Sequence, residues 1–122
     1  MPFKSPATLR VLQYAKQTFG SEPEFLWTKY PNNAVLRRAD SKKWYAALLS
    51  VHRSKLGLPG DAMTEILDLK CGPAMIGSLL DGQRYLPAYH MNKEHWITVL
   101  LDGSIPEEEL FPLIELSYQL AK

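Results

Sequence analysis

The sequence predicts an α+β fold, in which helices and strands share one hydrophobic core. Three observations support this class. A helical pattern of apolar residues occupies each end of the chain, short alternating apolar runs lie between the two, and turn residues separate those runs. With 122 residues and a hydrophobic fraction of 46%, the chain can form a core without disulfides, and we expect one domain over residues 1–122.

The first element is expected to be a helix over Pro6–Phe19. Ser5 is suited to the N-cap position, and Gly20 can adopt the left-handed conformation that ends many helices. The proline at the first helical position has a backbone angle that already fits a helix. The spacing of apolar residues predicts a core-facing set of Leu9, Leu12, Ala15 and Phe19.

Three strands are expected next, over Phe25–Tyr30, Ala34–Arg38 and Lys43–His52, with turns at residues 31–33 and 40–42. The third is the strongest strand pattern in the chain, because both of its alternating faces are apolar. A strand of this kind is usually central in its sheet and covered on both sides. Alternatively, one of its faces covers the surface of a partner.

The following part of the chain is expected to alternate short elements. The segment Arg53–Met63 contains two glycines and a proline, which is typical of a loop. The remaining expected elements are a strand over Glu65–Cys71, a helix over Pro73–Leu80, an extended segment over Arg84–His90, a helical turn over Asn92–His95 and a strand over Trp96–Leu101.

The last element is expected to be a helix that begins near Ser104. Ser104 and Glu107 have the spacing of a capping box, and the acidic run 107–109 suits the positive end of a helix dipole. Pro112 has no N–H to bond the preceding turn, so we expect a kink there. The predicted inner face consists of Leu110, Leu113, Ile114, Ser117, Leu120 and Ala121.

The formal net charge of +1 hides a strong asymmetry along the chain. Residues 1–60 contain ten Lys or Arg and three acidic residues, a net charge of +7, whereas residues 61–122 contain four bases and ten acids, a net charge of −6. This pattern indicates a basic surface that meets a polyanion, or two patches that attract each other. If the fold interleaves the two halves, however, the molecule has no separate basic and acidic sides.

Several features of the chain favour the cytoplasm. Cys71 is the only cysteine, so no internal disulfide can form, which fits a reducing compartment. The N-terminus lacks the apolar region of a signal peptide, and no apolar run approaches the roughly 18 residues that a membrane span needs. We therefore expect a cytoplasmic protein that has no membrane partner.

The densest group of polar residues is the segment His90–Trp96, which together with Cys71 invites a search for chemistry. His90 and His95 are five residues apart, a spacing poorly suited to one metal site, and the sequence has no Cys-x-x-Cys or His-x-x-x-His pair. A free cysteine at a strand end is usually a small buried hydrophobe rather than a nucleophile. We therefore expect no metal, no cofactor and no catalytic residue, and we interpret the segment as an irregular turn before a core tryptophan.

A basic hairpin is the best candidate for a binding surface. Arg37, Arg38, Lys42 and Lys43 surround one predicted turn, with two aromatic residues directly after it. Such a hairpin can follow the phosphates of a nucleic acid. A solvated hairpin tip explains the same charges, and the nearly balanced net charge is lower than that of most dedicated nucleic-acid binders.

Several motifs in the second half of the chain resemble those of the MmcQ/YjbR family. They are Glu65–Cys71, His90–Val99, Leu101–Pro106, Leu113–Ile114 and Ser117–Tyr118. The resemblance implies a secretion-chaperone-like, or CyaY-like, fold, which is an antiparallel sheet with helices packed on it. The implied order of elements is roughly α-β-β-β-β-α-β-α.

The same resemblance implies a non-enzymatic DNA-binding protein, with regulation as one role. Similar folds bind protein segments, so the alternative is a protein-binding adaptor or chaperone-like module, either as a single chain or as a homodimer. The residues expected to contact DNA are Arg37, Arg38, Lys42, Lys43, His90, Asn92 and Lys93.

Overall fold

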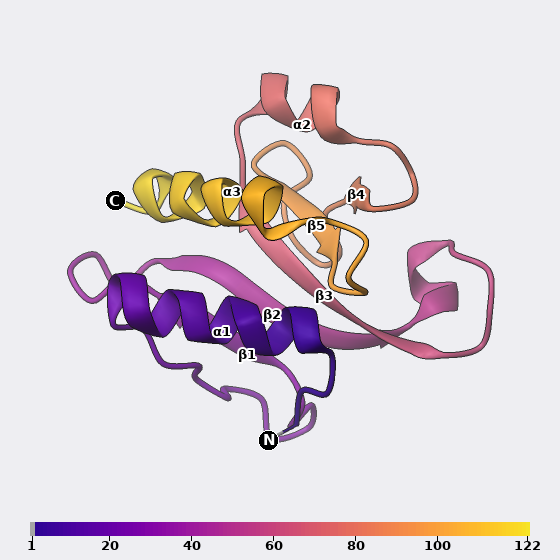
Figure 1. Ribbon diagram of the computed structural model, residues 1–122, viewed down its shortest axis with the longest axis horizontal. Helices are drawn as coiled ribbons and strands as arrows, with labels where there is room; N and C mark the ends of the chain where they lie inside the picture. The colour runs from indigo at the N-terminus through magenta and orange to yellow at the C-terminus, as the bar shows by residue number, and fades with distance from the viewer. Residues whose placement is uncertain (1) are drawn as a thin grey trace.

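The computed structural model describes residues 2–122, and these residues form one antiparallel sheet of five strands with helices packed on it. The strand order is β1-β2-β3-β5-β4, which confirms the α+β class (Figure 1). The elements are α1 (Pro6–Phe19), β1 (Ala34–Arg37), β2 (Trp44–His52), the 3-10 helix η1 (Arg53–Leu56), β3 (Met63–Lys70), α2 (Pro73–Leu79), β4 (Tyr85–Pro87), β5 (Trp96–Leu100) and α3 (Glu107–Leu120).

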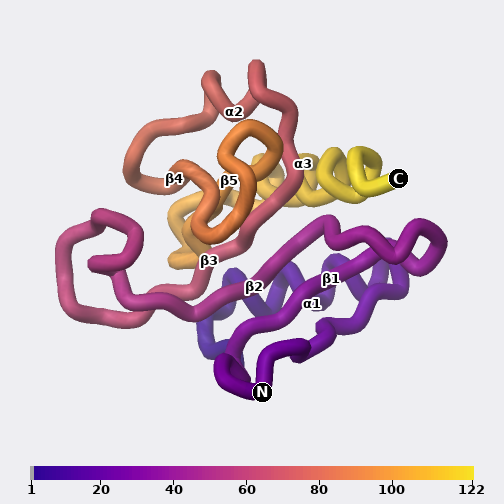
Figure 2. Tube along the Cα trace, turned by 180° about the vertical axis from the view of Figure 1, so that it is seen from behind, coloured from indigo at the N-terminus to yellow at the C-terminus, as the bar shows by residue number. Residues whose placement is uncertain are grey.

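The two long helices cover one face of the sheet, which we call the helix face. Figure 1 shows α1 and α3 in front of the strands, and the reverse view in Figure 2 places them behind. The main core lies between these layers, because alternate strand residues point toward the helices. Its buried members from the three middle strands include Ala46, Leu48, Leu67, Leu69, Ile97 and Val99.

Loops cover the opposite face, which we call the loop face. Leu56, the last residue of η1, packs on this face together with Leu58. Tyr89 also packs there, from the loop over residues 88–95, which we call loop 88–95. Both faces of β2 are therefore covered, and β2 lies between β1 and β3, so the predicted central strand is confirmed. The buried residues beneath these loops are Leu49, Val51, Ile66, Leu86 and Leu100.

A β-bulge at Tyr45 shapes the end of the sheet at which β1 ends and β2 begins. Leu36 pairs with Ala46 but Arg37 pairs with Trp44, so Tyr45 is the extra residue. Ser117 of α3 stabilises the bulge. Its hydroxyl donates to the carbonyl of Tyr45 at 2.5 Å and accepts the N–H of Lys70 at 2.8 Å. A buried helix side chain thus links β2 to β3 at this end of the sheet.

The start of α1 is held by a strand rather than by its own cap. Ser5 occupies the N-cap position as predicted, but its hydroxyl donates to the carbonyl of Leu101 instead of capping the helix. The carboxylate of Glu65 accepts the backbone N–H groups of Lys4 and Ser5 at 2.9 and 3.2 Å. Leu9 was predicted in the core but is 41% exposed, because the buried stripe is Thr8, Val11, Leu12 and Ala15.

The predicted strand over Phe25–Tyr30 is wrong. Only the neighbouring Glu24 pairs with Val35, as an isolated bridge. Beyond it the backbone forms local turns, since the N–H of Tyr30 bonds the carbonyl of Trp27 and the next turn follows directly. Backbone groups used in turns are not available for a strand ladder. Three strands therefore precede α2 instead of four.

The start of α3 also differs from the prediction. The helix begins at Glu107, and the N–H of Ser104 bonds the carboxylate of Asp102, so Ser104 and Glu107 form no capping box. The helix continues through Pro112, which is exposed, and Leu120 is 48% exposed rather than on the inner face. No helix in the described part of the chain is long and apolar enough to cross a membrane.

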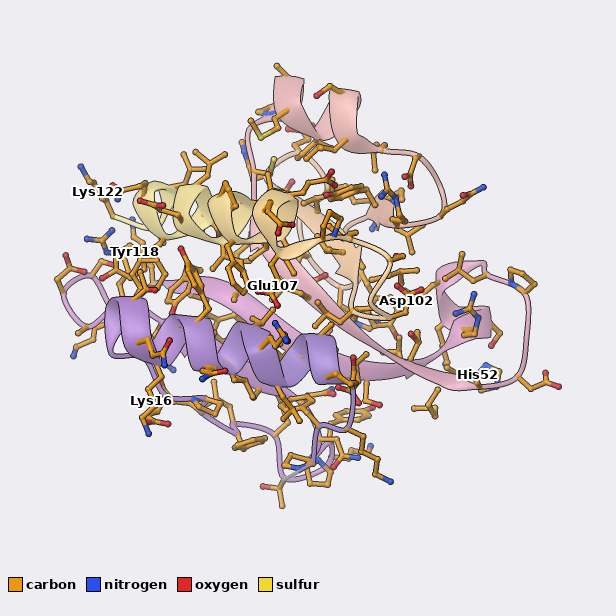
Figure 3. All side chains as sticks on the ribbon, in the orientation of Figure 1. Lys16, His52, Asp102, Glu107, Tyr118 and Lys122 are labelled. Atoms are coloured by element: carbon orange, nitrogen blue, oxygen red, sulfur yellow. The ribbon has the colours of Figure 1, made fainter. Side chains whose placement is uncertain are left out.

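The fold interleaves the two oppositely charged halves of the chain. Strand β3 belongs to the acidic half and lies between β2 of the basic half and β5. Arg10 of α1 pairs with Glu107 of α3, and Figure 3 shows Glu107 where these helices adjoin. Contacts between the two halves thus neutralise part of the basic charge. Where a polyanion can bind depends on the positions of the individual cations rather than on the charge of the whole N-terminal half.

Candidate nucleic-acid interface

The two arginines of the predicted basic hairpin are bound within the fold. Arg38 donates to both carboxylate oxygens of Asp40 at 2.8 and 2.7 Å. It also donates to the carbonyl of Tyr118 at 2.8 Å and lies over the ring of that residue at 4.2 Å. The hydrogen bonds from Arg38 hold the pKa of Asp40 well below its usual range. Arg37 pairs with Glu24 at 2.9 Å on the other face of the sheet.

The two lysines of the hairpin differ in their contacts with the rest of the fold. The ammonium of Lys43 donates to the carbonyl of Lys122 at 2.8 Å, which directs it to the C-terminal end of α3 (Figure 3). Lys42 is exposed and has a φ of 64°, a left-handed conformation that is uncommon for a residue other than glycine. Of the four predicted hairpin cations, the structure therefore directs Arg38 and Lys43 toward α3, away from the loop face.

Two pairs of a cation and a tryptophan lie at the same end of the loop face. Arg37 and Trp44 are register partners on β1 and β2. Lys70 and Trp96 are partners on β3 and β5, and the ammonium of Lys70 lies 5.3 Å from the Trp96 ring centroid. All four are partly exposed. Cations beside accessible rings are typical of surfaces on which bases stack and phosphates bind.

A third tryptophan extends this surface toward the edge of the sheet. Trp27 packs edge-to-face against Trp44, with ring centroids 5.8 Å apart and planes at 81°. Sequence reasoning assigned Trp96 to the core and did not select Lys70 as a binding residue. The alternation of polar residues at 68 and 70 with core residues on β3 was the signal for a functional face, but the register across strands was needed to place Lys70 beside Trp96.

Loop 88–95 carries the other predicted contact residues and is an ordered irregular turn. His90 has a φ of 59°, and Asn92 accepts the N–H of Glu94 at 2.8 Å through its side chain. The carbonyl of His95 accepts the N–H of Cys71 at 2.9 Å, which ties the loop to the end of β3. His90, Asn92 and Lys93 are all exposed. The loop follows β4 and precedes β5, so it lies next to the Lys70–Trp96 pair.

A buried acid lies beneath this loop. Asp68 is on the loop face of β3 with no exposed surface, and Thr98 donates to its Oδ1 at 2.5 Å. The Thr98 hydroxyl in turn accepts the N–H of Tyr89 at 2.8 Å, so Asp68 is joined to loop 88–95 through one hydroxyl. Burial raises the pKa of Asp68 to about 7, although Thr98 and the charge of Lys93 act to lower it.

The single cysteine is placed as a core residue. Cys71 is 4% exposed and belongs to the main core, and burial raises the pKa of its thiol. A raised pKa reduces the thiolate that nucleophilic chemistry needs. His90 and His95 are exposed on the loop, and residues 2–122 contain no group of three or more side chains able to hold a metal ion.

Comparisons with known proteins identify the relatives of this chain. A family model described as YjbR matches residues 17–120. The protein YyaQ of Bacillus subtilis is 44% identical over 112 residues, which cover 92% of this chain and 95% of YyaQ. A crystal structure of a Pseudomonas syringae protein has a TM-score of 0.90 at 43% identity and covers 93% of this chain and 97% of its own. A Deinococcus radiodurans structure has a TM-score of 0.67 at 27% identity, covering 98% and 80%.

Proposed function

The chain belongs to the YjbR family, also called MmcQ/YjbR, and we propose that it is a non-enzymatic DNA-binding protein that uses the loop face of its sheet. One observation carries the proposal: two pairs, each of a cation and a tryptophan, lie at one end of that face. Arg37 and Trp44 are partners on β1 and β2, and Lys70 and Trp96 are partners on β3 and β5. Lys93 on the adjacent loop adds an exposed cation.

The chemistry of this surface favours unpaired bases over an intact duplex. A tryptophan ring can stack on any base that is free of its partner, and such stacking contributes about 1–3 kcal/mol per base. Arg37 is held by Glu24 at the strand position opposite Trp44, and Lys70 lies over Trp96, so a cation accompanies each of the two rings on which bases would stack. We therefore infer that single-stranded DNA binds more tightly than a duplex of the same sequence.

Fluorescence anisotropy with a labelled single strand of about 12 nucleotides tests the proposal, because a strand of this length spans a typical binding face. If four phosphates are neutralised, affinity falls by about fifty-fold between roughly 50 and 200 mM salt. We expect Lys70→Ala and Lys93→Ala each to weaken binding and to reduce the salt dependence. Absence of binding at the lower salt concentration would overturn the proposal.

Lys16 provides a matched control for these substitutions. It is an exposed lysine on α1, on the other side of the molecule from the loop face, and it pairs with Glu22 at 3.2 Å (Figure 3). Lys16→Ala removes the same charge as Lys70→Ala but leaves the proposed surface intact. We expect it to leave affinity nearly unchanged, and an equal loss in this variant would show that binding depends only on net charge.

Exposed apolar side chains between α1 and β1 favour a second candidate, a protein-binding module. Phe25, Leu26 and Tyr30 are 44%, 45% and 57% exposed, and all three lie in the segment 25–30. Apolar patches of this kind often contact other proteins. Analytical ultracentrifugation of wild type and a Phe25→Ser, Leu26→Ser variant tests whether this patch joins two copies. A wild-type monomer across the micromolar range would contradict the homodimer.

A further inference from the structure

The buried carboxyl group of Asp68 has one oxygen without a hydrogen-bond partner among the described residues. Thr98 satisfies Oδ1, but Oδ2 is fully enclosed and receives no hydrogen bond from residues 2–122. An ionised carboxylate in this setting is costly, because charge is removed from water without compensation. A protonated carboxyl avoids that cost, so this site favours a bound proton.

The groups that face Asp68 contribute few charges. Ala47 of β2 is its register partner on one side and Thr98 of β5 on the other, and neither is charged. On β3 itself, Lys70 is the next residue on the same face, but its ammonium lies over Trp96. The charge that acts on Asp68 is therefore that of Lys93 on loop 88–95.

The other charged and titratable residues of the loop are His90, Glu94 and His95. All three are exposed, whereas Asp68 is buried. The connection between the two layers is the hydrogen bond from Tyr89 to Thr98, which continues to Asp68. A change in the charge of Asp68 is thus transmitted to the loop by this hydroxyl and by the attraction of Lys93.

We propose that DNA binding at the loop face is coupled to the uptake of one proton by Asp68, because Lys93 interacts either with the Asp68 carboxylate or with a DNA phosphate. When Asp68 is ionised, the uncompensated Oδ2 attracts the Lys93 ammonium and holds it near the protein. When a proton from solvent binds Oδ2, that attraction ends and Lys93 is free to contact a phosphate. The inference rests on the proposed function, since the phosphate belongs to the bound DNA.

The size of the coupling follows from the titration of Asp68. With a pKa of about 7, most of the protein carries the proton at pH 6 and little carries it at pH 8. If only the protonated form bound DNA, affinity would fall by about tenfold over this interval, which is the upper limit of the coupling. Partial release gives a smaller change of the same sign.

The first experiment uses the free protein. The chemical shift of the Asp68 side-chain carboxyl carbon and the Tyr89 amide shift are followed by NMR from about pH 4 to 9, a range that covers ordinary and raised carboxyl pKa values. We expect both to titrate with one midpoint near neutrality, and the Tyr89 transition to vanish in Asp68→Asn. A carboxyl that is fully ionised at pH 5, or a Tyr89 amide that does not follow it, would overturn the proposal.

The second experiment measures affinity for the labelled single strand at about pH 6 and pH 8, on either side of the expected transition. We expect weaker binding at the higher pH for wild type, by up to about tenfold, and loss of this difference in both Asp68→Asn and Lys93→Ala. Asp102→Asn changes an exposed acid and serves as the control, and this variant should keep the difference in affinity between the two pH values. Equal pH dependence in all variants would overturn the coupling alone, whereas absence of binding at both pH values would overturn the proposed function and the coupling together.

Discussion

Replacing Asp68 by Asn should make the protein more stable above neutral pH. The amide oxygen of Asn can still accept the hydrogen bond from Thr98, which Asp68 now accepts at 2.5 Å, but Asn cannot ionise. The variant therefore keeps the shape of the site and removes the cost of a buried charge. The comparison isolates one titrating group, because every other ionisable residue is the same in both proteins.

The magnitude follows from the pKa of Asp68 in the two states. The folded protein holds the proton up to a pH of about 7, whereas the unfolded chain releases it near the ordinary value of 3.8. Between these values the folded state binds more protons, so its stability falls as pH rises. From pH 5 to pH 8 the loss due to Asp68 is roughly 2.5 kcal/mol, an order-of-magnitude figure obtained from linkage.

Urea denaturation followed by circular dichroism at these two pH values provides the assay. Wild type should lose roughly 2.5 kcal/mol more than Asp68→Asn on going from the lower to the higher pH. The variant should be the more stable protein at pH 8. An identical pH dependence in the two proteins would refute the reasoning, because it would mean that Asp68 is already ionised in the folded state at pH 5.

Three further substitutions test the fold around the site. Ser117→Ala should lower the free energy of unfolding by about 2–3 kcal/mol in urea denaturation, since it leaves the buried carbonyl of Tyr45 and the partly buried N–H of Lys70 without their partner. An unchanged midpoint would contradict this. Glu65→Gln should cost about 0.5 kcal/mol, because it removes the negative charge at the start of α1, and the effect should shrink in high salt. Arg38→Lys should lower the urea midpoint by breaking the two-pronged bond to Asp40 while leaving DNA affinity unchanged, and a loss of affinity would show that this arginine contacts DNA.

The sequence was sufficient to predict the elements whose apolar pattern continues over many residues. The helix over Pro6–Phe19 has the predicted bounds, and β2 differs by one residue from the predicted central strand. These elements are stabilised mainly by their own apolar faces, which the sequence displays directly. The short aromatic run over Phe25–Tyr30 is not a strand, because its backbone forms local turns and only the neighbouring Glu24 pairs with β1 among the described residues.

The candidate site was harder to predict because it depends on register between distant segments. A basic run at residues 37–43 suggested one shared patch, but Arg38 bonds Tyr118 of α3 and Lys43 bonds Lys122 just beyond that helix, some 80 residues later. Lys70 and Trp96 became candidates only when β3 and β5 were paired. Asp68 alternates with core residues on β3, which is typical of a surface position, and its burial results from loop 88–95, whose irregular conformation no periodicity reveals.

The central claim, that DNA binds on the loop face, is tested most directly by NMR with the unlabelled single strand added to isotopically labelled protein. Indole N–H signals of tryptophan report on each ring separately. The account predicts that the indole signals of Trp44 and Trp96 and the amide of Lys93 shift with a common saturation curve, while amides of α1 stay in place. Shifts confined to α1 and α3, with both indole signals unmoved at saturation, would contradict it.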